Sequence, residues 1–310
     1  GQLAVIYRGP VKQEQLLSDL DLLEAAPVVV FKAAFPFPSS DGLDLFPLRV
    51  LDFAKAYENG GYLDDARREV RKEIEAQPTG NAALGAANRA RAWYYLGTLE
   101  QASRHWSAAA TAYGKAIEFS PRQTLMEVAR GVVLWQSGDK EAADRSFSIA
   151  AAAKSDPLSH LTALGKAHLQ IGRASDAVSY LERAFALKPD DLKLSLLLAF
   201  AHDKAGDHGE AISLYRELLK SRPESLEIKN NLSWILATCS DPTLRDGETA
   251  LALATEVNQK TKFLDPTLLS TLAAAQAQAG NRPAALKTNE KAITVARASG
   301  RDGLLKKLRE

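Results

Sequence analysis

The side chains that could act as nucleophiles or metal ligands are few in this sequence and do not cluster. Cys239 is the only cysteine among 310 residues, which rules out an intramolecular disulfide and a cysteine-based zinc site. The five histidines show no metal-ligand spacing, and His168 and His202 are interpreted as ordinary helix residues. The sequence therefore predicts no metal site and no cofactor.

The rest of the sequence does not contain a recognisable catalytic motif. Cys239 could in principle be a redox sensor, but no His or Lys lies near it in sequence, and its neighbours up to Ala237 are small and apolar. A glycine-rich phosphate loop, a nucleophile with its base, and paired carboxylates are all missing from the sequence. We predict no catalytic residues and expect the chain to act by binding.

Charge and hydropathy narrow the class of partner. The 39 basic and 38 acidic residues give a formal net charge of +1, which provides no general attraction to nucleic acid. The longest apolar stretches, 26–31 and 194–201, are far shorter than the roughly 20 residues that span a bilayer. We expect no nucleic-acid binding and no membrane insertion, and the compartment stays open.

A 34-residue period runs through the middle of the chain. It aligns Gly97 with Gly131, Gly165 and Ala199. The same register forms two further columns and ends most units at a proline, where a helix must stop. Small residues in these columns let antiparallel helices approach closely, and the large residue fills the space between hairpins. The columns contain Ala109, Ala143, Ala177 and Ala211, and Tyr113, Phe147, Leu181 and Tyr215.

Extending the register in both directions gives seven units, at about 47–80, 90–123, 124–157, 158–191, 192–225, 226–265 and 266–301. A nine-residue insertion near 81–89 precedes the second unit. In the sixth unit the spacing from Leu232 to Leu272 is 40, six above the period. This spacing predicts a longer loop between the two helices and an interrupted second helix around Ala250.

The unit that contains Trp93, Leu96, Gly97, Tyr113 and Pro121 resembles the tetratricopeptide repeat signature almost position for position. The resemblance implies an all-α fold, a right-handed superhelical solenoid of about seven helix-turn-helix units. The segment 231–247, NLSWILATCSDPTLRDG, resembles a variant repeat of bacterial, planctomycete-like proteins. That match indicates lineage rather than activity.

The two ends do not follow the repeat. Residues 1–25, which begin GQLAVIYRGPVKQEQLL, resemble the last strand and terminal helix of a redoxin or thioredoxin-like domain, a small β/α remnant. We expect residues 26–46 to form either a cap over the first hairpin or a built-in ligand of the groove on the inner surface of the repeats. We expect residues 302–310 to form a C-terminal capping helix. The redoxin resemblance implies, as an alternative, that the chain is the regulatory part of a larger enzyme, and it favours an exported bacterial protein.

In a repeat of this type the first helix of each hairpin lines the inner surface, so register predicts the residues that face a groove. We expect this groove to bind a peptide or helix of another protein, with self-association of the chain as an alternative. The Lys and Asn clamp by which some such repeats hold a C-terminal carboxylate is absent, since Tyr94, Thr98 and Ala129 occupy comparable positions. The predicted groove residues are Tyr94, Thr98, Gln101, Trp135, Gln136, Lys166, Gln170, Phe200, Lys204, Asn230 and Trp234.

Overall fold

The computed structural model describes residues 54, 55, 57–75, 82–121, 125–154, 156–300 and 305. The chain divides into two compact units, Gly1–Ser146 and Phe147–Glu310. Within the described ranges the regular structure is helical and contains no strand. The predicted segments 1–25 and 26–46 fall outside these ranges, as does 302–310 apart from Leu305. The predicted superhelical sense concerns the whole chain and stays a prediction.

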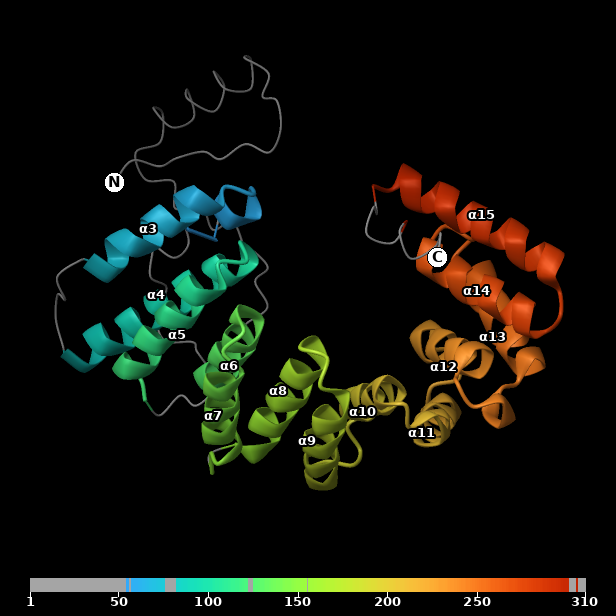
Figure 1. The fold of residues 1–310 in the computed structure, drawn as a ribbon, viewed down its shortest axis with the longest axis horizontal. Coiled ribbons are helices and arrows are strands. Elements are labelled where there is room, and N and C mark those ends of the chain that lie inside the picture. Colours follow the sequence, from blue (N-terminus) through green and yellow to red (C-terminus); the bar gives the residue numbers. More distant parts are fainter. Residues whose placement is uncertain are drawn as a thin grey trace, which may run out of the picture. The chain divides into compact units, whose positions relative to one another are not determined.

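The first unit contains a short helical stretch around Tyr57 and then α3 to α6, each packed against the next along the chain (Figure 1). Tyr113 is the largest fully buried side chain here and packs between Ala109 and Val133. A Cβ atom on Gly97 would lie 2.6 Å from its ring, so only glycine fits at that position. The helices are α3 (Leu63–Glu75), α4 (Ala82–Ala102), α5 (Trp106–Phe119) and α6 (Leu125–Ser137), and α7 (Lys140–Ala151) crosses into the second unit.

In the second unit, α8, α10, α12 and α14 alternate with α9, α11, α13 and α15, and each helix contacts the next (Figure 1). We call α8, α10, α12 and α14 the first helices and the others the second helices. The core contains Leu181, which fills the space above Gly165 as Tyr113 does above Gly97. The helices are α8 (Pro157–Gln170), α9 (Ala174–Leu187), α10 (Leu192–Ala205), α11 (His208–Ser221), α12 (Leu226–Thr238), α13 (Gly247–Lys260), α14 (Pro266–Gln278) and α15 (Arg282–Ala298).

The repeat columns predicted as packing residues are buried. The alanine column is fully enclosed from Ala109 to Ala211, and the large column is at most 2% exposed from Tyr113 to Tyr215. The glycines predicted to end first helices have the left-handed backbone that glycine favours, with φ between 80° and 95°. These glycines are Gly61, Gly138, Gly172, Gly206 and Gly280.

The two irregular stretches differ in structure from each other. Residues 82–89, within the predicted insertion, extend α4 at its N-terminal end, so that this helix has 21 residues. In the sixth unit the connection is longer, as predicted, and contains the 3-10 turn η1 (Pro242–Leu244). The prediction of an interrupted helix around Ala250 is wrong, because α13 runs unbroken and Ala250 packs in its core-facing side.

Aspartates cap several helices of the second unit at their N-termini. The Asp191 carboxylate accepts hydrogen bonds from the backbone N–H groups of Lys193 and Leu194, and Asp246 accepts one from Thr249. The Lys188 ammonium and then the backbone donors lower the pKa of Asp191, and the hydrogen bonds from Thr249 lower that of Asp246. Such carboxylates stabilise the fold only while they are ionised.

We expect the double substitution Asp191→Asn and Asp246→Asn to weaken the acid sensitivity of the second unit. Since the folded pKa lies below the ordinary value near 3.9, the stabilisation is full above that value and is lost as pH falls through the lowered pKa. Asparagine caps a helix nearly as well but does not titrate. The melting temperature, followed by circular dichroism at pH 7 and pH 3, should therefore fall less in the variant than in the native chain.

The control is Ser225→Ala, which removes the uncharged cap of α12, where the serine hydroxyl accepts from Ile228. It should cost about 1 kcal/mol at both pH values. An equal acid-induced fall in the Asp variant and the native chain would show that the caps do not govern the acid sensitivity.

Candidate protein-binding face

The first helices of the second unit contain six of the predicted groove residues, five of them exposed and Asn230 half-buried. Because the period is 34 residues, matching positions on α8, α10 and α12 point to the same side of the unit. Phe200 and Trp234 occupy the same repeat position, and each is 38% exposed. We define the first-helix face as Lys166, Gln170, Phe200, Lys204, Asn230 and Trp234.

Phe200 is held by a neighbour on its own helix. The Lys204 ammonium lies 5.0 Å from the centroid of the Phe200 ring, one helical turn away, and also 3.0 Å from an Asp203 carboxylate oxygen. A cation over an aromatic face is attracted by the ring quadrupole. This contact restrains the ring and its cation before any partner arrives, which lowers the entropy cost of binding.

Asn230 provides an unused polar group beside Trp234. Its Oδ1 atom is buried and has no hydrogen-bond partner within the described part of the chain, while its Nδ2 atom is 3.5 Å from Asn231 Oδ1. Leaving a buried acceptor unpaired costs about 1–3 kcal/mol. Trp234 follows Asn230 by four residues and therefore shares its side of α12. An apolar anchor and an unsatisfied acceptor thus lie together on one helix.

The predicted residues of α4 are engaged inside the first unit. The Tyr94 ring lies 5.2 Å from that of Tyr113, and burial raises the pKa of Tyr94. The Thr98 hydroxyl donates to the Tyr95 carbonyl at 2.7 Å. Gln101 accepts a 2.8 Å hydrogen bond from the Tyr113 hydroxyl. The structure therefore gives these three side chains internal packing contacts.

The two predicted residues of α6 differ in exposure. Trp135 is half-buried, with the Lys140 ammonium 5.1 Å from its ring centroid, whereas Gln136 is exposed. Both belong to the first unit, whereas the first-helix face belongs to the second. The candidate site is accordingly confined to α8, α10 and α12.

Cys239 is a structural residue rather than a reactive one. It is 3% exposed, and its thiol donates to the Asp241 carbonyl at 3.3 Å. Burial raises the pKa of this thiol, opposed in part by the Arg245 guanidinium. A thiol kept protonated is a poor nucleophile. Among the residues that the structure describes, no group of three or more His, Cys, Asp or Glu side chains could hold a metal ion.

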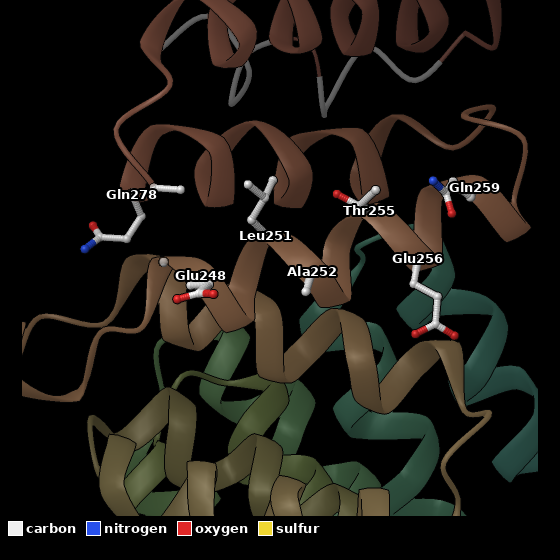
Figure 2. Close-up of a pocket in the computed structure, with 9 residues that line it drawn as sticks. Glu248, Leu251, Ala252, Thr255, Glu256, Gln259 and Gln278 are labelled. Atoms are coloured by element: carbon white, nitrogen blue, oxygen red, sulfur yellow. The ribbon is translucent and has the colours of Figure 1, made fainter.

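A shallow pocket of about 720 Å³ lies along α13 (Figure 2). Leu251 and Ala252 form its apolar middle, and Glu248 and Gln278 lie at one end. Glu256 is already paired with Lys229 at 2.5 Å and Lys260 at 3.1 Å. The lining has no nucleophile beside a base, so the pocket does not have the composition of an active site.

Polar residues follow the small column by three positions, among them Glu100, which the sequence reasoning did not single out, and His202, which it interpreted as an ordinary helix residue. Glu100 and His202 occupy this position in different units and are 5% and 7% exposed. A charged or titratable side chain on the apolar side of a helix was the available signal. His168, at the same position, is enclosed between the rings of Phe147 and Tyr180.

No helix among the described residues is long and apolar enough to cross a membrane. Comparison with solved structures identifies chains of the same fold. A tetratricopeptide repeat protein from Parabacteroides merdae is 11% identical, with a TM-score of 0.54, covering 84% of this chain and 96% of that one. Yeast Tom70 is 15% identical, with a TM-score of 0.58, covering 93% of this chain and 61% of Tom70. At these identities the likeness concerns the fold alone.

Comparison with curated proteins gave no match. The tetratricopeptide repeat family model matches residues 128–191 and, in the next register, 162–225. The two matches are offset by 34 residues, which is the period that aligns Gly131, Gly165 and Ala199. Together they cover most of α6 and all of α7 to α11, including α10, which contains Phe200 and Lys204. Residues 128–225 therefore match the tetratricopeptide repeat family.

Proposed function

We propose that this chain is a non-catalytic protein-interaction scaffold whose first-helix face binds a segment of another protein. Phe200 and Trp234 anchor the partner through apolar side chains. Exposed aromatic residues of this kind are enriched among the few that dominate binding energy. The observation that carries the proposal is the exposure of both rings at one repeat position.

The repeat architecture supports this function. Stacked hairpins create extended surfaces on which side chains recur at fixed spacing, and such surfaces suit an elongated ligand. Lys166 and Lys204 favour a partner with carboxylates near its apolar side chains. The expected ligand is an extended or helical segment with two apolar anchors and flanking acidic residues.

A selection from a displayed random peptide library tests the proposal with the full chain. Selected peptides should contain paired apolar residues, and their binding should depend on Phe200 and Trp234. Leu187 and Leu286 are matched controls, because both are large, apolar and more exposed than the two aromatic residues but belong to second helices. Peptides whose binding depends on the two leucines instead would place the interaction on another surface.

A further inference from the structure

Two grooves lie at the same repeat register, one in each unit. One, of about 400 Å³, is in the first unit, bordered by α3 and α5 with α4 as its floor. The other, of about 510 Å³, is in the second unit, bordered by α9 and α11 with α10 as its floor. The register pairs Arg71 with Glu182, Glu100 with His202, and Ala108 with Glu210.

In the first groove the chain neutralises its own buried carboxylate. Glu100 lies on the floor, and the Arg71 guanidinium reaches it from α3 at 3.3 Å. Arg67 lies 4.0 Å from the other carboxylate oxygen, which also contacts His105 Nδ1 at 2.8 Å. This groove shows that a guanidinium fits between α3 and α5 and pairs with an acceptor on α4.

The lining of the second groove contains carboxylates but no lysine or arginine. His202 is buried and lines the groove. Its Nδ1 atom lies 3.3 Å from Asp207 Oδ2. Its Nε2 atom lies 4.0 Å from Glu182 Oε1, which is too far for a hydrogen bond. The Asp207 carboxylate can only accept, so Nδ1 is the donor in this contact, and in the neutral imidazole Nε2 is then an acceptor. The lining residues are Glu182, Phe185, Leu198, His202, Gly209, Glu210, Ser213 and Leu214.

His168 occupies the same repeat position as His202, but its ring is enclosed by neighbouring side chains. It is 2% exposed, its Nδ1 atom is 2.8 Å from the Leu164 carbonyl oxygen, and its ring lies 4.5 Å from that of Phe147 and 5.0 Å from that of Tyr180. Aromatic side chains thus enclose this histidine. Around His202 the positions that match these two rings contain Leu181 and Leu214, and Glu182 and Glu210 line the groove.

We propose that the groove between α9 and α11 binds an arginine side chain of a partner protein. The planar guanidinium donates to the Glu182 and Glu210 carboxylates and to Nε2 of His202, which matches its fork of five donors. Phe185 offers an aromatic face, and Leu198 and Leu214 offer apolar surface to the aliphatic stem. The partner thereby supplies the cation that Arg71 supplies within the first unit.

The test is a titration of the full chain with N-acetyl-arginine-N-methylamide, followed by nuclear magnetic resonance of the His202 ring and the Leu198 and Leu214 methyl groups. N-acetyl-citrulline-N-methylamide, a neutral isostere, is the matched ligand control. Arginine should shift these signals in a saturable way, and citrulline should not. Equal shifts from both ligands, or no saturable shift from arginine, would overturn the proposal.

Variants assign the effect to the carboxylates. Glu182→Gln and Glu210→Gln should each raise the Kd for the arginine probe about threefold to tenfold, and the double variant should abolish saturation. Glu217→Gln, on the same helix but bordering a different pocket and paired with Lys220, should leave the Kd unchanged. All three glutamates are exposed, so these variants should fold. An unchanged Kd in the double variant, with native circular dichroism, would contradict the assignment.

Discussion

Alanine in place of Tyr113 is expected to lower the free energy of unfolding of the first unit by about 3–5 kcal/mol. The ring is 1% exposed and packs against Tyr94, Trp106 and Val133. Its removal leaves a cavity beside Gly97, because glycine has no side chain that could fill any of the space. Urea unfolding followed by tryptophan fluorescence measures the loss, since Trp93, Trp106 and Trp135 all belong to this unit.

Tyr113→Phe is the matched control, because it keeps the ring and removes only the hydroxyl that donates to Gln101. It should cost about 1 kcal/mol, the usual net value of one hydrogen bond. If the alanine variant were no less stable than the phenylalanine variant, the large repeat column would not be the packing element that the structure shows.

The double substitution Phe200→Ala and Trp234→Ala is expected to weaken binding of a selected peptide at least about a hundredfold. Loss of an aromatic hot spot typically costs 2 kcal/mol or more, and each 1.4 kcal/mol changes the Kd tenfold. Both rings are partly exposed, so the fold should tolerate their removal better than it tolerates that of Tyr113. Isothermal titration calorimetry with native and variant chains gives the two Kd values.

The control for this prediction is the double substitution Leu187→Ala and Leu286→Ala, which removes comparable apolar surface from second helices. It should leave the Kd within about twofold of the native value. Equal losses in both double variants would indicate a general effect on stability rather than a site at the first-helix face.

Much of the fold followed from the 34-residue period. A repeated position needs the same volume in every unit, so the alanine column and the Tyr113 column could be identified as core from residue size alone. The period did not predict the secondary structure of the two irregular stretches. Residues 82–89 could have formed a loop, and helical propensity together with packing extended α4 instead. Ala250 lies within an unbroken helix because the additional residues form a capped turn before it.

The candidate site was predictable only in part. Register assigns a residue to one side of a helix, which was enough to select Phe200 and Trp234. It does not reveal contacts between helices, so the hydrogen bond from the Tyr113 hydroxyl to Gln101 could not be foreseen. The role of His202 depends on glutamates contributed by two other helices, which no linear pattern brings together.

Site-directed photo-crosslinking tests the central claim most directly. The chain carries p-benzoylphenylalanine either at position 200, on the first-helix face, or at position 187, on a second helix, and is irradiated in an extract of its source cells. The account predicts that position 200 crosslinks to a specific protein, that excess selected peptide blocks this crosslink, and that position 187 gives no crosslink to that protein. A specific, peptide-insensitive crosslink from position 187, with none from position 200, would contradict it.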